Sequence, residues 1–394
     1  MRKVLSFFWH NFFSYLFFFP LSFFFLKIRF GSVKTQRMGH FIPNTEYYLI
    51  EKKIENNNCL DILYKAKMIC NSQVYKMVRR KVFLFPAWIF HVHKFFKLFS
   101  KNRYEINILK ISPRDTKNYL QKYSCQLDMT DEELEVGKKQ FIDKFNCDPD
   151  NEKIVYLAVR DSEYLKKQFP KNDWSYHNYR DWDIARFIPA CEYLASIGYK
   201  VFRMGKFTNQ EFNVNNPNII DYVNSKHRSD ILDIFIAKKS CFSVSTGSGI
   251  DMAPLLFRKP VAMIHLPFEF SYFHNQNINM TQHHYSLTKN KNLSMSEIFM
   301  EGSKINFAYT SDTYKKLNIK LIQNSPIEIL DLVKEMHLNL NEPIVRDNYN
   351  LKLEKDFWEI FNFNLKKYNL DKVHGQISGK FSLSFLKNNP YFLN

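Results

Sequence analysis

The sequence predicts an α/β protein in which a doubly wound parallel sheet fills the carboxyl-terminal half and a smaller α/β domain precedes it. At 394 residues, the chain has the length expected of two domains. After Ile154, apolar strand-like runs alternate with helix-like segments, which is the pattern of parallel strands joined by helical crossovers. One of these runs meets its helix through the loop Ser245–Gly249, which holds two of the chain's 10 glycines.

The loop Ser245–Gly249 has the composition of a phosphate-binding turn. It follows the short β-type run Cys241–Ser245 and precedes an expected helix at Ile250–Phe257. A turn of small residues between a strand and a helix directs backbone N–H groups towards one point, at the positive end of the helix dipole. The alternative is an ordinary turn of a parallel sheet, because short glycine motifs are weakly specific. The candidate phosphate contacts are Ser245, Thr246, Gly247, Ser248 and Gly249.

The ends of the predicted strands carry polar residues. Strands are expected at Ile154–Val159, Tyr199–Met204, Ile219–Val223, Cys241–Ser245 and Val261–Leu266. Helices are expected at Asp183–Ser196, Ile231–Lys238, Ile250–Phe257, 326–338 and Leu353–Tyr368. In open parallel sheets, ligands bind where the strands end. We therefore expect a ligand site made by the Ser245–Gly249 loop and by Arg160, Asp161, Ser162, Arg203 and Gly205.

The amino-terminal half is expected to hold a separate, smaller domain. Ile28–Val33 is a predicted strand, Arg37–His40 a turn and Asn44–Leu49 the opening of a helix. Thr130 and Glu133 have the spacing of a capping box before another helix. The polar turn Cys147–Lys153 then separates the two halves. The predicted domains cover residues 27–150 and 151–340, followed by a helix and tail at 341–394.

Residues 1–26 are expected to form a hydrophobic membrane anchor. The Phe-rich run Val4–Leu26 is long enough to cross a bilayer and is bordered by basic residues. His10-Asn11 and Pro20 interrupt the run, and its aromatic side chains prefer the membrane interface. A monotopic or re-entrant anchor is therefore favoured over a single span. A buried core helix is the alternative.

Arg79–Phe99 is a second aromatic and basic stretch. Lys94 and Lys97 alternate with phenylalanines, and the stretch is too interrupted to span a membrane. This pattern suits a helix or loop that lies on anionic lipid headgroups. The edge of a domain core is the alternative.

The composition favours an anionic partner. Lys and Arg number 56 against 39 Asp and Glu, which gives a net charge of +17. Such a charge suits anionic lipid or a nucleotide diphosphate. The sequence shows no compact Lys/Arg run and no nucleic-acid-binding signature, so we expect no nucleic-acid partner. The 6 cysteines form no C-x-x-C pair, as in a reduced cytosolic protein without structural zinc.

Several short motifs, in their order and spacing, resemble a family of bacterial glycosyltransferases associated with surface-polysaccharide (capsule and lipopolysaccharide) synthesis. They are Arg37–His40, Val159–Ser162, Tyr176–Ile184, Gly198-Tyr199, Arg203–Gly205, Arg228–Asp230, Ser245–Gly249 and Phe385–Lys387. The resemblance covers nearly all of the chain after its hydrophobic start. It implies a GT-B-like fold of two Rossmann-like domains facing a cleft, with the acceptor side amino-terminal and the nucleotide-sugar side carboxyl-terminal.

The donor domain is similar, more distantly, to fucosyltransferase-like enzymes that carry His-x-Arg after its first strand. This chain has Ala158-Val159-Arg160 there, so the role of that histidine is absent. Departure of a nucleotide diphosphate leaves negative charge, which Arg160, Arg203 and the loop N–H groups could stabilise without a metal or other cofactor. Within Tyr176–Asp183, we expect Arg180 to contact phosphate, whereas Asp183 contacts a ligand or caps the next helix.

The acceptor side is expected to supply the general base. Its candidate residues are Arg37, Gly39 and His40, with His40 as the first candidate base and Glu46 as the second. The expected partners are a nucleotide sugar, a lipid-linked or glycan acceptor and the membrane surface. The expected location is the cytoplasmic face of the bacterial inner membrane, as a peripheral or monotopic protein. The alternative is a non-catalytic membrane-bound scaffold or polysaccharide-binding protein with the same fold.

Overall fold

The computed structural model describes residues 28–55, 59–100, 105–106, 115–264, 276–342, 347–370, 375 and 379–394. The chain divides into two compact units. Unit 1 comprises residues 1–114 and 122–133, and unit 2 comprises residues 115–121 and 134–394. The predicted anchor at residues 1–26 lies outside the described residues.

The division between the units comes before residue 150. Helix α6 (Asp131–Phe145) packs on the sheet of unit 2, where the ring of Phe141 lies 5.4 Å from that of Phe202 and 6.0 Å from that of Phe235. The polar turn Cys147–Lys153 therefore connects two elements of unit 2. The predicted capping box is confirmed, since Thr130 and Glu133 exchange hydrogen bonds of 3.0 and 3.3 Å.

Unit 1 is a small parallel sheet with helical crossovers. Its strands are β1 (Ile28–Val33), β2 (Leu60–Lys65) and β3 (Leu84–Phe85), paired in the order β1-β2-β3. Its helices are α2 (Met38–Glu55), α3 (Ser72–Lys81) and α4 (Ile89–Ser100). The predicted strand Ile28–Val33 is confirmed.

The predicted turn at Arg37–His40 is wrong. Helix α2 begins at Met38, because the carbonyl of Arg37 already accepts a hydrogen bond of 2.9 Å from the N–H of Phe41. The chain turns one step earlier, where the N–H of Arg37 reaches the carbonyl of Lys34 at 3.5 Å. Gly39 and His40 therefore lie in the first turn of a helix.

Unit 2 contains a parallel seven-stranded sheet in the order β13-β9-β8-β7-β4-β5-β6. All of its described pairs are parallel. The strands are β4 (Lys153–Ala158), β5 (Tyr199–Arg203), β6 (Ile219–Ile220), β7 (Phe242–Ser245), β8 (Val261–Ile264), β9 (Ile278–Met280) and β13 (Lys380–Phe381). Within this sheet, the chain enters at the central strand β4 and continues through β5 to the edge strand β6. It then returns to β7, beside β4, and continues through β8 and β9 towards the opposite edge. This is the strand order of a doubly wound nucleotide-binding sheet.

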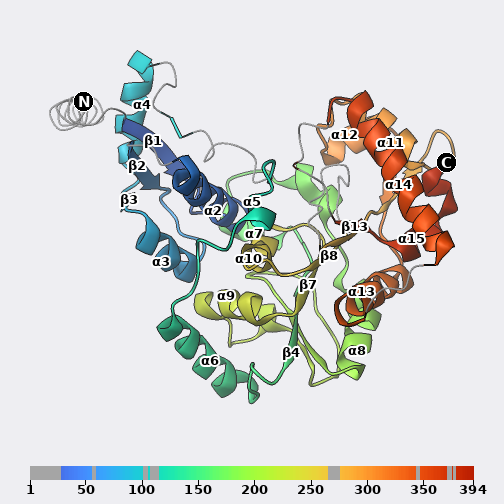
Figure 1. Ribbon diagram of the computed structural model, residues 1–394, viewed down its shortest axis with the longest axis horizontal. Coiled ribbons are helices and arrows are strands. Elements are labelled where there is room, and N and C mark those ends of the chain that lie inside the picture. The colour runs from blue at the N-terminus through green and yellow to red at the C-terminus, as the bar shows by residue number, and fades with distance from the viewer. Residues whose placement is uncertain are drawn as a thin grey trace. The chain divides into compact units, whose positions relative to one another are not determined.

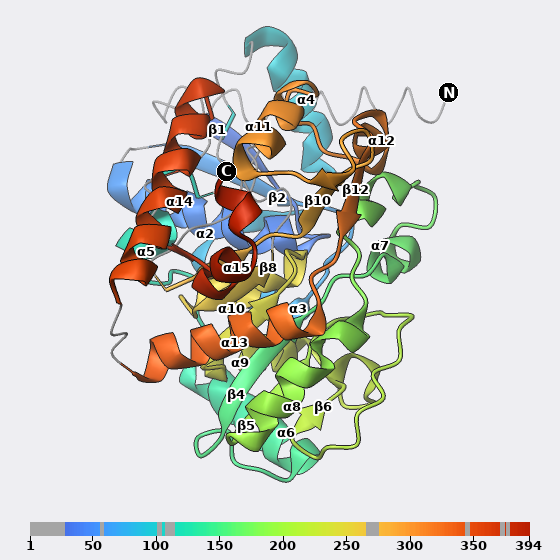
Figure 2. The same cartoon turned by 90° about the vertical axis from the view of Figure 1, so that its right-hand side faces the viewer.

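Helices cover both faces of this sheet. Val155 and Leu157 of β4 share a buried cluster with α8 (Ile188–Ser196) and α13 (Pro326–Asn341), and Figures 1 and 2 show both helices on that face. α9 (Asp230–Lys239) lies with α6 on the opposite side (Figure 1). Side chains of a strand point alternately to the two faces, so every residue of β4 from Ile154 to Ala158 is buried.

A second, antiparallel sheet with the order β11-β10-β12 was not predicted. Its strands are β10 (His283–Ser286), β11 (Lys291–Asn292) and β12 (Ile319–Ile322). The predicted strands of the parallel sheet are confirmed within a few residues, except that Ile219–Val223 stops at Ile220 and Val261–Leu266 is described only to Ile264. The remaining helices are α5 (Tyr119–Lys122), α7 (Glu163–Gln168), α10 (Met252–Leu256), α11 (Met295–Ser303), α12 (Ser311–Lys316), α14 (Asn348–Lys367) and α15 (Leu383–Asn388). Short 3₁₀ helices lie at Ser175–Arg180, Ile184–Phe187, Tyr222–Asn224, Gly249–Asp251 and Pro390–Leu393.

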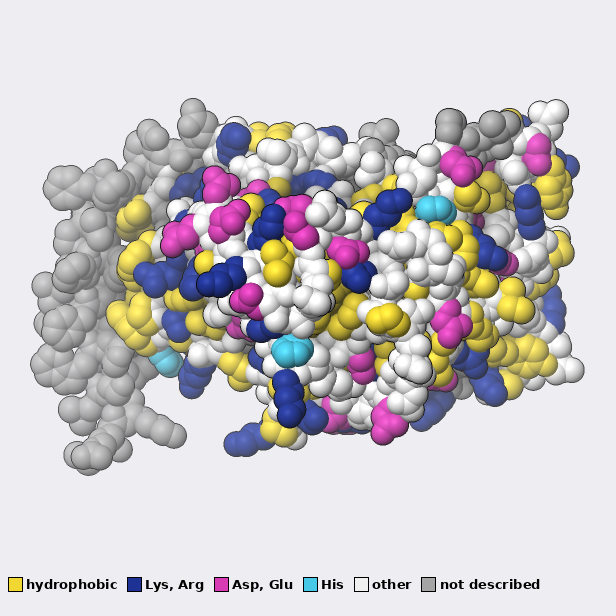
Figure 3. Space-filling model, turned by 90° about the horizontal axis from the view of Figure 1, so that it is seen from below, with side chains coloured by type: hydrophobic (Ala, Val, Ile, Leu, Met, Phe, Trp, Pro, Cys, Tyr) yellow, Lys and Arg dark blue, Asp and Glu magenta, His cyan; other side chains and the backbone are white. Residues whose placement is uncertain are grey.

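The surface mixes charges of both signs. On the face drawn in Figure 3, Asp and Glu side chains are interspersed among Lys and Arg side chains, so the positive charge is not gathered into one patch there. Among the helices that the structure describes, none combines the length and the apolar character that crossing a bilayer requires.

Candidate functional site

The predicted site residues of unit 2 gather at the point where the strand order reverses. β4 and β7 are neighbours, but the chain leaves β4 towards β5 and leaves β7 towards β8. Their two loops diverge at the carboxyl ends of the strands, and this is where open α/β sheets bind ligands. Arg160 follows β4, and the loop Ser245–Gly249 follows β7.

Hydrogen bonds tie these two loops together. The backbone N–H of Arg160 donates to the hydroxyl of Thr246 at 2.9 Å, and the N–H of Thr246 donates to the carbonyl of Ala158 at 3.1 Å. Thr246 is buried, so both bonds are shielded from water. The loops therefore hold a fixed position, as preorganised recognition of a ligand requires.

Two arginine side chains lie close together at this junction. The guanidinium of Arg160 pairs with the carboxylate of Asp181, and the guanidinium of Arg180 donates to the carbonyl of Gly247. The side chain of Arg160 is only 9% exposed. Burial lowers the pKa of Arg160 and raises the pKa of Asp181, because both groups lose water around their charges.

The N–H groups of the glycine-containing loop are largely occupied. Gly247 donates to the hydroxyl of Ser245 at 3.0 Å, Ser248 donates to the carboxylate of Asp251, and Ile250 donates to the hydroxyl of Ser248 at 3.3 Å. Gly247 has a φ of 75°, a left-handed conformation that favours glycine. The sequence predicts that this loop directs several unbonded N–H groups at a phosphate. In the structure, these three N–H groups have hydrogen-bond partners within the loop.

Asp251 is the loop residue that sequence reasoning missed. Its carboxyl group is 1% exposed and is bonded by Ser245 and by Ser248. Burial raises its pKa to about 7. The signal was present in the sequence, since Asp251 stands three residues after Ser248 in the spacing of a capping box.

Arg203 and Gly205 lie on the neighbouring β5 and its loop. The guanidinium of Arg203 donates to the carbonyl of Gln210 and to the hydroxyl of Thr208, both at 2.9 Å, and lies 3.4 Å from Asp221. These contacts give Arg203 the geometry of a structural residue that holds the loop after β5. At Gly205, an added Cβ would lie 2.8 Å from the side chain of Val223, so a side chain there requires a local shift.

Asp161 and Ser162 connect these parts. Thr208 donates its hydroxyl to Asp161, and the hydroxyl of Ser162 hydrogen-bonds to Asp181. Within Tyr176–Asp183, the carboxylate of Asp183 accepts from the N–H of Ala185 at 2.9 Å, which is the helix-capping alternative. Gln323 fixes the same segment, because its amide donates to the carbonyl of Asp181 at 3.0 Å.

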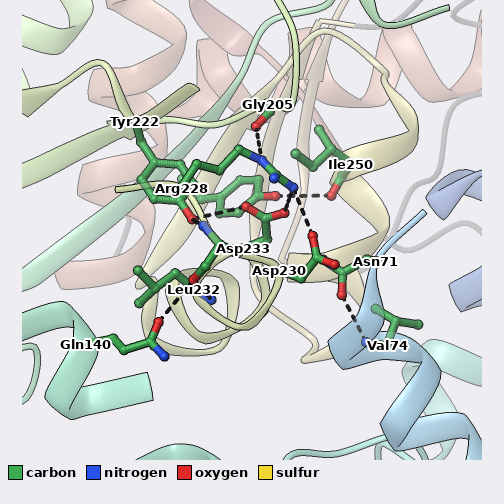
Figure 4. A network of polar contacts seen from close by, with 12 residues as sticks. Asn71, Val74, Gln140, Gly205, Tyr222, Arg228, Asp230, Leu232, Asp233 and Ile250 are labelled. Atoms are coloured by element: carbon green, nitrogen blue, oxygen red, sulfur yellow. Dashed lines mark hydrogen bonds and ion pairs between the residues drawn. The ribbon is translucent and has the colours of Figure 1, made fainter. Parts of the chain in front are cut away.

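A second polar network stabilises the loop after β5. Arg228 donates to the carbonyl of Gly205 at 3.1 Å and pairs with the buried carboxylate of Asp233, which also contacts the hydroxyl of Tyr222 at 3.1 Å (Figure 4). Burial raises the pKa of Asp233 to about 6. Arg228 belongs to the predicted Arg228–Asp230 motif, and Asp233 lies in the helix α9 that this motif begins.

Two orphaned polar side chains lie beyond the antiparallel sheet. The hydroxyl of Thr281 and both amide atoms of Asn324 are buried without a hydrogen-bond partner, and both residues are 0% exposed. Buried polar groups of this kind cost stability when nothing bonds to them. No sequence motif marked them.

The acceptor-side candidates belong to unit 1. Burial is the main cause that lowers the pKa of His40 to about 4, and the nearby charges of Lys34 and Arg37 lower it further. Its imidazole is therefore neutral at pH 7, and its Nδ1 atom is buried without a hydrogen-bond partner. Gly39 precedes it in the first turn of α2.

Glu46 has a different environment from the one expected of a base. It is 0% exposed, and its carboxylate accepts from the N–H groups of Gln126 and Leu127 at 3.0–3.1 Å. These bonds fasten α2 to the segment that precedes α6. The geometry is that of a structural carboxylate.

No group of three or more His, Cys, Asp or Glu side chains within the described ranges is arranged to hold a metal ion. No family model matches the chain, and no curated protein matches it either.

The chain is similar to solved glycosyltransferase structures. One is the glycosyl transferase family 9 protein from Veillonella parvula, with a TM-score of 0.43 and 10% identity over 79% of this chain and 97% of that one. Another is the iron-containing dodecameric glycosyltransferase TibC from enterotoxigenic E. coli, with a TM-score of 0.32 and 12% identity over 62% and 58%. A third is the heptosyltransferase TibC in complex with ADP-D-β-D-heptose, with a TM-score of 0.30 and 12% identity over 60% and 57%. None of the three is described as a fucosyltransferase.

Proposed function

We propose that this protein transfers a sugar from a nucleotide-diphosphate donor to a membrane-associated acceptor, either a glycan or a lipid-linked one, during cell-surface polysaccharide synthesis. The observation that supports the proposal most is the junction of β4 and β7, where Arg160 and Arg180 converge on the loop after β7. Guanidinium groups match the geometry of phosphate oxygens and stay charged at every physiological pH. The junction lies at the switch point of a doubly wound sheet, where nucleotides bind.

The chemistry assigned to this site is a single displacement at the sugar. The bond between the anomeric carbon and the diphosphate oxygen breaks as an acceptor hydroxyl forms the new bond, and the electron pair leaves with the diphosphate. Arg160 and Arg180 stabilise the negative charge of the departing diphosphate, which is the role that a metal ion would otherwise have. One preorganised donor lowers the activation barrier by roughly 3–4 kcal/mol. His40 is the candidate that takes the acceptor proton, because its Nδ1 atom has no hydrogen-bond partner among the described residues and can accept one.

The proposed location is the cytoplasmic face of the bacterial inner membrane. Nucleotide sugars are cytosolic, and the cysteines of the described residues are free thiols, as is usual in that compartment. Attachment to the bilayer is peripheral or monotopic.

The test is a thermal-shift screen followed by a turnover assay. UDP-, GDP-, CMP-, dTDP- and ADP-sugars are offered separately to the purified protein. A ligand present at 100 times its dissociation constant stabilises the folded state by about 2.7 kcal/mol, so the correct nucleotide gives a clear rise in Tm. The donor that gives this rise is then followed for release of its nucleoside diphosphate.

A non-catalytic binding protein with the same fold is the second candidate. The observation that favours it is that the cationic groups of the site have internal partners: Arg160 pairs with Asp181, and Arg203 bonds within its own loop. Both candidates predict stabilisation by a nucleotide sugar or a glycan. Only the enzyme predicts release of nucleoside diphosphate, so the turnover assay separates them.

A further inference from the structure

Unit 1 carries an exposed aromatic surface. Phe83 is 68% exposed, Trp88 48% and Phe90 51%, and all three lie between the end of α3 and the first turn of α4. Exposed aromatic side chains that follow one another so closely usually mark an interaction site. We refer to Phe83, Trp88, Phe90 and Lys94 as the α4 surface.

Packing in the core of unit 1 keeps the side chains of the α4 surface exposed to solvent. Ile89 and Val92 of α4 are 1% exposed and pack with β1 and β2, and His93 is buried against the ring of Phe30 at 5.2 Å. Phe90 and Lys94 lie one turn apart on the exposed side of the helix. Turning Phe90 inward would therefore unpack Ile89 and Val92.

The segment that carries the α4 surface has charged residues of one sign. From Ser72 to Ser100 the chain has no Asp or Glu, whereas it has Lys76, Arg79, Arg80, Lys81, Lys94 and Lys97. Two of these cations are engaged, because Arg80 pairs with Glu133 at 2.6 Å and Lys97 lies 3.3 Å from Glu105. Lys81 and Lys94 are exposed. An aromatic surface bordered by exposed cations complements an anionic lipid headgroup layer.

We propose that the α4 surface docks on an anionic bilayer, with Phe83, Trp88 and Phe90 entering the headgroup region and Lys94 contacting the lipid phosphates. The proposal rests on the proposed function, since a membrane-associated acceptor requires unit 1 to reach the bilayer. Within the predicted stretch Arg79–Phe99, only exposed residues contact the membrane in this proposal. The buried part of that stretch forms the edge of a domain core, so each of the two predicted alternatives describes a different part of it.

The experiment uses the full chain and compares two matched double variants in vesicle co-flotation. The first is Phe90→Ser with Lys94→Glu. The control is Phe363→Ser with Lys367→Glu on α14, where a Phe that is 64% exposed and a Lys also lie one turn apart. The vesicles are phosphatidylcholine alone, or phosphatidylcholine with phosphatidylglycerol.

We expect the α4 double variant to lose about tenfold in partitioning onto the anionic vesicles, because one cation contact is reversed in sign and one aromatic anchor is lost. The loss is smaller on neutral vesicles or at high salt, which screens the lysine contribution. The control partitions like the wild-type chain. Residues 1–27 are present in all three proteins, so their contribution cancels in the comparison.

Equal partitioning of the two double variants would overturn the proposal. So would a fall in oligomer mass by light scattering, for the α4 variant alone, without a change in vesicle binding, since the surface would then join copies of this chain. Vesicle binding needs no donor, and nucleotide-sugar stabilisation is measured without vesicles. A failure of this proposal is therefore distinct from a failure of the proposed function.

Discussion

Replacing Asp181 with Asn tests whether the carboxylate of Asp181 competes with a bound diphosphate for the guanidinium of Arg160. In the resting protein, Asp181 occupies the guanidinium of Arg160, and a diphosphate must displace it. A hydrogen bond between charged groups contributes about 1.5–3 kcal/mol, whereas a neutral amide acceptor contributes roughly half as much. The variant should therefore bind inorganic pyrophosphate about 3- to 10-fold more tightly, since about 1.4 kcal/mol corresponds to a tenfold change in affinity.

The assay is isothermal titration calorimetry with pyrophosphate at constant ionic strength. The matched control is Asp221→Asn, because Asp221 is the partner of Arg203 at 3.4 Å and its side chain is 23% exposed, against 25% for Asp181. Arg203 bonds to Gln210 and Thr208 within the loop after β5, so this control should leave pyrophosphate affinity unchanged. Weaker or unchanged binding by Asp181→Asn, or an equal gain in both variants, would refute the reasoning.

Three further outcomes are expected. Thr281→Val should raise the free energy of unfolding by about 1 kcal/mol in urea titrations, because it removes a buried hydroxyl without a partner; a loss of stability would point to a partner for that hydroxyl. For Asp251, the folded-state pKa of about 7 lies above the ordinary 3.8, so the native state retains a proton that the unfolded state loses, and stability falls as the pH rises between about 4 and 7. Asp251→Asn should flatten that fall relative to wild type in urea titrations at several pH values; identical profiles would contradict the raised pKa. Thr246→Val should weaken pyrophosphate binding severalfold, because it removes the hydroxyl that fixes the backbone of Arg160; an unchanged dissociation constant would show that this hydrogen bond does not position the site.

The alternation of strand-like and helix-like segments was sufficient to predict β4, β5, β6, β7 and β8 of the sheet of unit 2. The central strand β4 is buried on both faces from Ile154 to Ala158, so its sequence is a continuous apolar run that stands out from the flanking loops. The short strands β9 and β13 were missed, because two or three residues carry no detectable period. The start of α2 was also missed, because the local preference of Gly39 for turns was outweighed by the packing of the helix that follows.

The site could be predicted only as far as strand ends can be read from a sequence. Placing Arg160 beside the Ser245–Gly249 loop required only the rule that ligands bind at the carboxyl ends of parallel strands. The partners of these residues were not predictable, because Asp181 and Gln323 reach the junction from segments remote in the sequence. The burial of Glu46 was equally hidden, since its partners at Gln126 and Leu127 are contacts between distant parts of the chain.

The most direct test of the central claim is turnover of the nucleotide sugar that stabilises the protein, measured as nucleoside diphosphate release by wild type and by Arg160→Ala. Wild type should release nucleoside diphosphate, and the variant should lose roughly 100- to 1,000-fold in turnover, as expected when one preorganised donor to the leaving charge is removed. Arg160→Lys, which keeps the charge but not the bidentate geometry, should fall between the two. A wild-type protein that binds the donor without releasing nucleoside diphosphate, or a folded Arg160→Ala protein that turns it over at the wild-type rate, would contradict the account.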